Sequence, residues 1–286
     1  MIDVDLPEPD GKQVTVGAHT VHYIDLGEGR PTVFLHGGGP GCSGWTDFGT
    51  VADAFASDRR VLLMDLLHFG RSSMEPFTAP RWSYHAQVVA GALDAIGIEN
   101  ADFVCNSVGG STAIALAAER PDLVGRLVLT GSEPVPGAVP MTPWHGERGR
   151  TAYTRYYDED GGPTREKLLE IIAELEWTGA DAVPSWTYDL RWELSTRPEL
   201  VALGGDWSPA GGRGIAQDLG AHLGLVAAPT LLLWGAVDAF ATPAYALELA
   251  QRLPEASLHV MAGGAHHMEE ELPAPYTALV KAFLDS

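Results

Sequence analysis

Cysteines and basic residues are scarce in this sequence. Only two cysteines, Cys42 and Cys105, occur in 286 residues, which leaves no disulfide framework and no cysteine-rich metal site. We interpret both as small packing residues. The 18 lysines and arginines stand against 38 aspartates and glutamates, for a net charge of −20. Nucleic acid and anionic lipid bind to cationic surfaces, so neither is expected as a partner.

Long apolar runs are also missing. No stretch of about 18 apolar residues is present to span a bilayer. The first ten residues carry four acidic side chains and no apolar core, unlike a signal peptide. We therefore expect a cytoplasmic protein that does not contact membranes. Hydrophobic residues make up 45% of the chain and charged residues 20%, which is typical of globular proteins and argues against disorder and fibrous repeats.

Short apolar runs alternate with helix-length segments along most of the chain. After an opening hairpin, turn-bounded apolar runs predict strands at 31–36, 60–65, 102–106, 126–131, 230–235 and 257–261. The segments between them predict helices at 85–97, 111–120, 242–253 and 274–285. Continuous apolar strands are typical of parallel sheets, which are buried on both faces. The alternation predicts an α/β fold with a doubly wound, mostly parallel sheet.

The pattern changes over residues 134–226, which contain helix-like pieces and no buried-strand run. We interpret this stretch as a helical lid inserted between the sixth and seventh sheet strands, with residues 1–133 and 227–286 forming the core. An insertion there would lie above the carboxyl ends of the strands, where open α/β sheets bind ligands.

Ser107 stands at a sharp turn between a predicted strand and an alanine-rich helix, and Gly109 and Gly110 follow it. A serine hydroxyl is a poor nucleophile unless it is held beside a base. A strand–turn–helix elbow with small residues on either side holds it in this way. Cys105 takes the preceding small position in place of glycine. The alternative is a serine that only caps a helix, and the partners described below favour the nucleophile.

The loop after the strand at 31–36 contains three successive glycines, Gly37–Gly39. Such a loop frees backbone N–H groups to face an anion. An oxyanion hole beside this kind of elbow uses one N–H from the loop and the N–H after the nucleophile, here that of Val108. A phosphate loop is the rival interpretation, but no Gly-Lys-Ser/Thr follows. We expect His36 to brace the loop rather than to transfer protons.

An acid and a histidine follow the last two predicted strands. Asp238 lies just past the seventh strand, and His266 and His267 lie just past the eighth. This gives the order serine, acid, histidine that the elbow requires. A buried carboxylate would hold the imidazole in the correct tautomer, and the imidazole would accept the serine proton. Glu133, directly after the sixth strand, remains the alternative acid.

The adjacent histidines also raise the possibility of a metal. Neighbouring side chains diverge, however, and no other histidine or cysteine lies at helical spacing from the pair. Zinc sites need several converging ligands. We therefore expect neither a metal nor another cofactor.

With these motifs, the chain resembles the α/β-hydrolase superfamily and, within it, the meta-cleavage product hydrolases, which hydrolyse carbon–carbon bonds in aromatic and steroid ring degradation. The resemblance runs nearly end to end and rests on HYIDLGEGRPTVFLHGGGPGCSGWTDF, RWELSTRPE, LGAHLGLVAAPTLLLWGAVDAFATP and GGAHHMEEELP. It implies a triad of Ser107, Asp238 and His266, with Gly38 and Val108 as oxyanion donors. It also implies a homodimer or a higher homo-oligomer.

The same resemblance implies how a small hydrophobic substrate is held. Arg191, in the lid, matches the family's arginine for the substrate carboxylate, and its planar fork suits bidentate binding. By this resemblance Gly39 and Asn106 would line the polar end of the pocket. His267, beside the triad histidine, is a further candidate substrate contact.

Several positions around the pocket depart from the family pattern. Leu67-His68 replaces Pro-Gly, Asp47 replaces asparagine, Ala265 replaces glycine, and His267 replaces tryptophan. The resemblance implies a serine hydrolase that cleaves a carbon–carbon bond in a 2-hydroxy-6-oxo-dienoate ring-fission product. The departures keep open a carboxylesterase or lactonase that acts on a hydrophobic aryl or macrocyclic ester. A non-catalytic ligand receptor on this fold is a third possibility, which the complete triad disfavours.

Overall fold

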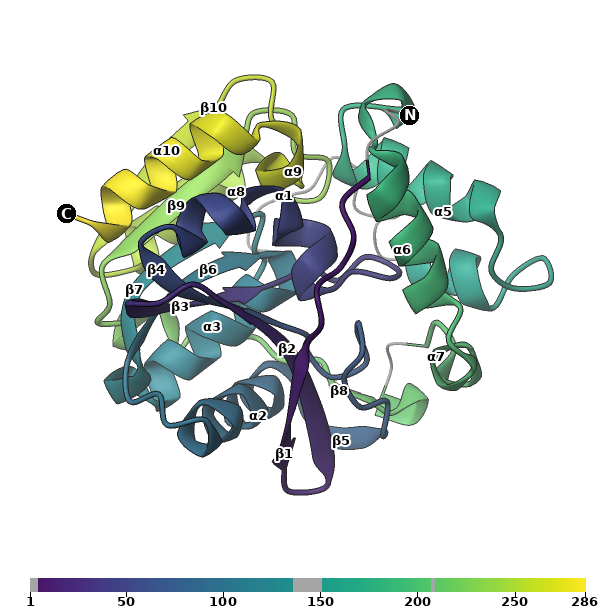
Figure 1. Ribbon diagram of the computed structural model, residues 1–286, viewed down its shortest axis with the longest axis horizontal. Coiled ribbons are helices and arrows are strands. Elements are labelled where there is room, and N and C mark those ends of the chain that lie inside the picture. Colours follow the sequence, from purple (N-terminus) through teal and green to yellow (C-terminus); the bar gives the residue numbers. More distant parts are fainter. Residues whose placement is uncertain (1–4, 136–150, 207–208) are drawn as a thin grey trace.

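A mostly parallel sheet of eight strands forms the centre of the computed structural model, which describes residues 5–135, 151–206 and 209–286 (Figure 1). The strand order is β1-β2-β4-β3-β6-β7-β9-β10. Only the pairs of β2 with β1 and β4 are antiparallel. The strands are β1 (Lys12–Val16), β2 (His19–Leu26), β3 (Arg30–Leu35), β4 (Arg59–Met64), β6 (Ala101–Asn106), β7 (Val124–Thr130), β9 (Thr230–Gly235) and β10 (Ala256–Met261).

The predicted strands coincide with those of the structure to within about two residues, and the expected fold class is confirmed. Every residue of β6 and β9 is buried, as continuous apolar runs require in the middle of a covered sheet. These strands place their carboxyl ends, and the loops that follow them, at one edge of the sheet.

Helices cover both faces of the sheet (Figure 1). One apolar cluster joins the sheet to α2 (Arg81–Ala95), α3 (Ser107–Glu119) and α8 (Pro243–Arg252). A second joins it to α1 (Gly44–Ala56) and α10 (Pro273–Leu284). Within the described ranges, no helix is both long and apolar enough to cross a membrane.

The sequence interpretation missed α1, α9 and four short 3₁₀ turns. The turns are Pro121–Leu123, Ala180–Ala182, Pro209–Gly211 and Leu223–Leu225, and α9 is Met268–Glu271. A reciprocal pair of hydrogen bonds between Ser43 and Thr46 begins α1, which is a capping box in which Thr46 takes the usual place of glutamate. This cap places residue 47 in the first turn of α1, directly above the glycine-rich loop.

The segment between β7 and β9 carries a separate group of helices, drawn beside the sheet in Figure 1. They are α5 (Arg165–Ile171), a π-helical turn (Ile172–Glu176), α6 (Ser185–Ser195) and α7 (Pro198–Leu203). The expectation of no strand in this segment was wrong, because the short β8 (Arg213–Ile215) pairs with β5 (Phe77–Pro80). Residues 136–150 and 207–208 lie outside the described part, so the lid limits 134–226 stay a prediction.

Candidate active site

Ser107 occupies the turn between β6 and α3 in a conformation that side chains rarely adopt. Its φ is +48°, in the left-handed region, which costs a non-glycine residue about 1–3 kcal/mol. The residue is partly exposed, whereas Asn106 before it is buried. A Cβ atom on Gly109 would lie 2.1 Å from the Leu35 carbonyl oxygen, and one on Gly110 would lie 1.8 Å from Ser132 Oγ. The elbow therefore needs both glycines.

The glycine-rich loop lies against the first turn of α3. His36 braces it, as expected, because the Leu66 N–H donates to Nε2 at 3.0 Å and Nδ1 donates to the Gly37 carbonyl at 2.6 Å. A Cβ atom on Gly38 would lie 2.4 Å from Val108 Cγ2, so the two segments touch. In the described structure, no hydrogen bond is made by the Gly38 N–H, and the Val108 N–H in a first helical turn has no intrahelical acceptor. Both amides are therefore available to bind an anion.

Asp238 and His266 meet at the carboxyl ends of β9 and β10. His266 Nδ1 lies 2.9 Å from Asp238 Oδ2. The other oxygen of Asp238 accepts hydrogen bonds from the N–H groups of Phe240 and Ala241, at 2.8 and 3.0 Å. These donors fix the carboxylate against the imidazole. The carboxylate that the structure places on Nδ1 is thus that of Asp238 rather than that of Glu133.

The imidazole of His266 is a stronger base than an ordinary histidine. Burial alone would lower its pKa, but the Asp238 carboxylate more than offsets this, and the pKa lies above the usual 6.5. The charges of Glu176 and Glu133 act in the same direction. A base of this kind suits the removal of a proton from a serine hydroxyl.

Asn106 joins the serine elbow to the histidine loop. Its Nδ2 donates to the His266 carbonyl at 2.9 Å and to Glu269 Oε1 at 2.7 Å. Gly131, at the end of β7, has a φ of +57°, and a Cβ atom there would lie 2.5 Å from His266 Cε1. The end of β7, the serine elbow and His266 therefore occupy one place at the sheet edge.

Arg191 reaches this place from α6, but its charge is already paired. The guanidinium binds both carboxylate oxygens of Glu176, and its Nε donates to the Pro40 carbonyl at 3.0 Å. Both side chains are 1% exposed. Burial would raise the pKa of Glu176, but Arg191 and His267 lower it below the usual value, which indicates an ionised carboxylate. Arg191, predicted to bind the substrate carboxylate, is thus paired with the carboxylate of Glu176 in this structure.

Gly39 lies directly beneath this pair. A Cβ atom there would lie 2.1 Å from Glu176 Oε1 and 2.4 Å from Arg191 Nη2. The backbone N–H groups of His266 and His267 both donate to the Glu176 carbonyl, at 3.1 and 3.0 Å. The segment that carries Glu176 therefore packs on the glycine-rich loop and on the histidine loop at once.

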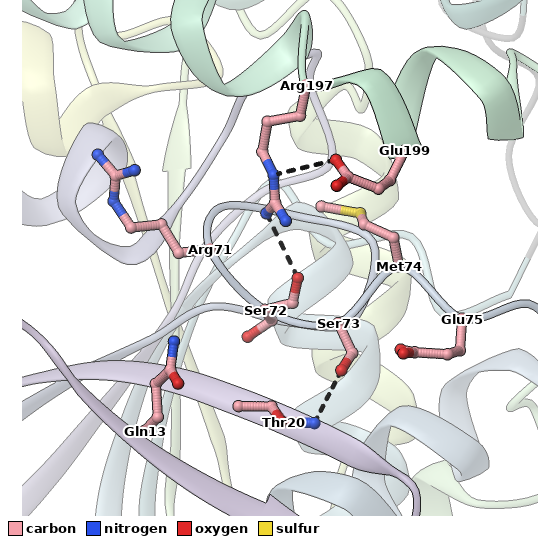
Figure 2. A pocket seen from close by; sticks show the side chains of 9 residues that line it. All are labelled: Gln13, Thr20, Arg71, Ser72, Ser73, Met74, Glu75, Arg197 and Glu199. Carbon is pink, nitrogen blue, oxygen red and sulfur yellow. Dashed lines mark hydrogen bonds and ion pairs between the residues drawn. The ribbon is translucent and has the colours of Figure 1, made fainter.

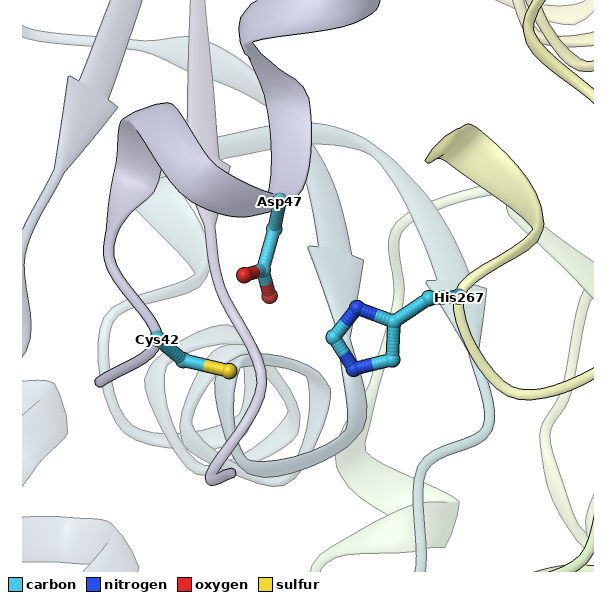
Figure 3. Close-up of side chains that lie close together, drawn as sticks. All are labelled: Cys42, Asp47 and His267. Atoms are coloured by element: carbon cyan, nitrogen blue, oxygen red, sulfur yellow. The ribbon is translucent and has the colours of Figure 1, made fainter. Parts of the chain in front are cut away.

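The ring of His267 lies 5.6 Å from that of His266 and points toward α1 (Figure 3). Its Nδ1 lies 3.0 Å from Glu270 Oε1, and its ring faces Asp47 and Cys42 (Figure 3). Burial raises the pKa of Glu270 well above its usual range. Three of the predicted substrate-binding residues, Gly39, Arg191 and His267, thus lie around Glu176. The fourth, Asn106, lies beside His266.

Comparisons with known proteins show the family to which the chain belongs. A model of the family described as alpha/beta hydrolase fold matches residues 31–271. The chain belongs to the α/β hydrolase fold family. The 2-hydroxy-6-oxononadienedioate/2-hydroxy-6-oxononatrienedioate hydrolase 2 of Pseudomonas putida is 33% identical to this hydrolase over 266 residues, which are 92% of this chain and 91% of that protein.

Other relatives and solved structures carry names of the same class. A 2-hydroxy-6-oxo-6-phenylhexa-2,4-dienoate hydrolase of Comamonas testosteroni is 30% identical over 272 residues, covering 92% of this chain and 91% of its own. A mutant of the meta-cleavage product hydrolase of Pseudomonas fluorescens IP01, complexed with acetates, superposes with a TM-score of 0.80 at 25% identity and covers 96% and 97% of the two chains. The expected family and the resemblance to meta-cleavage product hydrolases are confirmed.

Sequence reasoning missed Glu176, although one signal pointed to it. Glu176 comes four residues after Ile172 and next to Leu175, both of which are fully buried. A charged residue at an apolar position of a helix needs a buried partner. Its position at the end of a π-helical turn fits the tendency of such turns to occur at functional sites.

A surface cleft of about 480 Å³ lies apart from these residues (Figure 2). It is lined by Gln13, Thr20, Arg71, Ser72, Ser73, Met74, Glu75, Arg197 and Glu199. Arg197, at the start of α7, donates to the Gly70 carbonyl at 2.5 Å and lies 4.0 Å from Glu199. This arginine attaches the inserted helices of the hydrolase to the core, and none of the predicted catalytic residues lines the cleft.

Proposed function

We propose that the protein is a serine-triad hydrolase that cleaves a carbon–carbon bond in a 2-hydroxy-6-oxo-dienoate ring-fission product of aromatic degradation. The observation that carries the proposal is the buried imidazole of His266, held by Asp238 at the edge where the Ser107 elbow ends. The names of the relatives, which act on substrates of this type, support the substrate class.

The side chains perform the reaction in two stages. The dienol first becomes a ketone, and the Gly38 and Val108 amides stabilise the oxygen that carries negative charge. His266 then takes the proton of Ser107, whose oxygen attacks the side-chain ketone to form a tetrahedral intermediate. Collapse of that intermediate breaks the carbon–carbon bond and leaves an acyl group on Ser107, and the dienoate fragment takes the proton that His266 had accepted, which returns the imidazole to its neutral form. Water activated by His266 then releases the acid.

The polar end of the pocket lies where α6 meets the glycine-rich loop. In this proposal Arg191 holds the substrate carboxylate, with Gly39, Asn106 and His267 around it. Because Glu176 already occupies the guanidinium, the substrate must compete with an internal anion. The inserted helices act as the lid, since they supply both members of this pair. The cytoplasmic location and the homo-oligomer stay predictions.

The proposal is tested with purified protein and yellow ring-fission products that differ in their side-chain acyl group. We expect the yellow absorbance to disappear and one acid and one 2-hydroxydienoate to form for each substrate consumed. The Ser107→Ala variant is the matched control. Unchanged absorbance at micromolar enzyme would reject this substrate class.

A carboxylesterase or lactonase is the second candidate, and the Glu176–Arg191 pair favours it. With Arg191 already paired with Glu176 and with Asp47 close by, the described residues at the polar end offer no unpaired cation to an anionic substrate. An ester enzyme would show a higher kcat/KM for neutral aryl esters or lactones than for any ring-fission product. The ratio of the two values, measured on one preparation, decides between the candidates.

Freeing Arg191 should strengthen the binding of an anionic substrate. We expect Glu176→Gln to lower KM for a ring-fission dienoate by about threefold or more, because a neutral amide competes less well for the guanidinium. The KM for a neutral aryl ester should stay within a factor of two. The control is Glu174→Gln, at an exposed position of the same turn. A KM that rises equally for both substrates would show that the pair only supports the fold.

The pH profile follows from the raised pKa of His266. A protonated imidazole cannot act as a base, so kcat/KM should rise with pH, with a midpoint above 6.5. Asp238→Asn removes the charge that raises the pKa, so the imidazole of this variant should titrate at lower pH, which NMR of its ring protons measures. The measurement is kcat/KM from pH 5 to 9 (about one titration range on either side of histidine). A wild-type midpoint below 6 would contradict the assignment.

A further inference from the structure

Three buried side chains of different chemistry converge beside the catalytic histidine. Donor atoms of Cys42, Asp47 and His267 all lie within 4.8 Å of one another. The residues come from the loop after β3, the first turn of α1 and the loop after β10, and Figure 3 shows their side chains pointing toward one space. None is more than 1% exposed. From this juxtaposition we propose that they bind a divalent transition-metal ion of the zinc type.

The spacing and the chemistry of the three groups fit such an ion. Zinc binds thiolate sulfur at about 2.3 Å and imidazole nitrogen or carboxylate oxygen at about 2.0–2.2 Å, so tetrahedral ligands stand about 3.5 Å apart. Small rotations of side chains bring atoms within 4.8 Å of one another to that spacing. A set of sulfur, nitrogen and oxygen donors selects zinc or cobalt over magnesium or calcium, which prefer oxygen alone.

His267 is oriented as a metal ligand. Its Nδ1 lies 3.0 Å from Glu270 Oε1, which leaves Nε2 as the coordinating atom. Among the described residues Nε2 has no hydrogen-bond partner, and Glu176 Oε2 lies 3.9 Å away. Metal-binding histidines almost always donate their second ring N–H to a carboxylate or carbonyl, which fixes the tautomer. Glu270 is the carboxylate beside the second ring nitrogen of His267.

A buried acceptor without a partner marks the same space. Asn106 is fully buried, and its Oδ1 makes no hydrogen bond in the described structure. A methyl group on Gly37 would lie 3.2 Å from that oxygen, 3.4 Å from Asp47 Oδ2 and 3.6 Å from His267 Nε2. Unsatisfied buried acceptors are rare in folded proteins. A metal-bound water or the ion itself would satisfy Asn106 at this position.

The charge of Asp47 supports the same conclusion. Its carboxylate accepts hydrogen bonds from the Gly37 N–H at 2.7 Å and from Thr46 Oγ1 at 2.9 Å. No ion pair of Asp47 is present in the described part of the chain, and the nearby Arg191 is bound to Glu176. Buried charges in proteins are paired or bind metals. The sequence argument against zinc concerned the two adjacent histidines as a pair of ligands, and only His267 belongs to this cluster. The additional ligands come from positions more than 200 residues away.

Cobalt spectroscopy tests the site without substrate, so the result is independent of the proposed reaction. Untagged protein is stripped with a chelator and titrated with Co²⁺. We expect one equivalent to bind, with an intense sulfur-to-cobalt band in the near ultraviolet and d–d bands of tetrahedral cobalt. Added Zn²⁺ should remove both.

Substitutions assign the ligands. Cys42→Ser should abolish the sulfur-to-cobalt band, whereas Cys105→Ser, at the other buried cysteine, should keep it. His267→Gln and Asp47→Asn should weaken Co²⁺ binding at least tenfold, and Glu270→Gln should weaken it about 10–100-fold as a supporting residue. Circular dichroism without metal establishes that each variant is folded.

Two results would overturn the proposal. One is Co²⁺ binding without a sulfur band, or with a band that survives Cys42→Ser. The other, which needs no variant, is a thermal midpoint of the stripped wild-type protein that does not rise with saturating Zn²⁺, because a ligand bound only to the folded state must raise it.

Discussion

Replacing Ser107 with alanine should lower kcat by a factor of about 10⁴ or more and change KM little. The expected loss is large because the strained backbone at Ser107 serves to present one oxygen atom, and alanine has no atom to take its place. Binding should persist because the amides of Gly38 and Val108 and the lid residues remain. The measurement is steady-state kinetics on the best substrate found.

Ser111→Ala is the matched control for this variant. Ser111 lies one turn further along α3 and is buried, so the substitution removes a hydroxyl from the same helix without touching the elbow. It should retain at least half of wild-type kcat. If Ser107→Ala kept more than one-tenth of the activity, a serine nucleophile at this position would be ruled out.

Replacing Asp238 with asparagine should also lower kcat by about 10⁴-fold. The carboxylate accepts from two backbone N–H groups through one oxygen and holds His266 Nδ1 through the other. Asparagine can keep the first contacts, but its amide favours the wrong tautomer of the imidazole, with the proton on Nε2. The serine then has no base.

Glu133→Gln separates the two candidate acids. Both carboxylates raise the pKa of His266, but only that of Asp238 is placed on Nδ1 by a hydrogen bond in the described structure. We expect Glu133→Gln to lower kcat less than tenfold. A loss of about 10⁴-fold in Glu133→Gln, together with a mild effect of Asp238→Asn, would make Glu133 the triad acid.

The sheet could be predicted because each buried parallel strand is a short, continuous apolar segment of the sequence. The run TLLLWG is the whole of β9, and all its residues are buried. The helix α1 was missed although Trp45, Phe48, Ala52 and Phe55 form a buried apolar face at helical spacing, because the two glycines within it, at 44 and 49, are poor helix formers. The strand β8 was missed because three residues carry almost no periodicity, and its pairing with β5 joins segments more than 130 residues apart.

Some residues of the candidate site could be predicted from short motifs, and others depend on tertiary packing. The elbow, the glycine loop and the acid–histidine pair follow individual strands, so short motifs reveal them. The Glu176–Arg191 pair depends on how α6 and the π-helical turn pack together on Gly39, which no local pattern records. His68 is similar: its φ of +69° explains why glycine is usual there in the resembled family, and its stacking on Phe77 at 5.2 Å is a tertiary contact.

Covalent labelling with a fluorophosphonate tests most directly whether Ser107 is the activated nucleophile. The reagent captures a serine only where a base and oxyanion donors act on it. We predict one label per chain by intact mass, located on Ser107 by peptide mapping, and a rate at least about 10³-fold lower in His266→Ala. Labelling of a different residue, or equal labelling of the wild type and His266→Ala, would contradict the account.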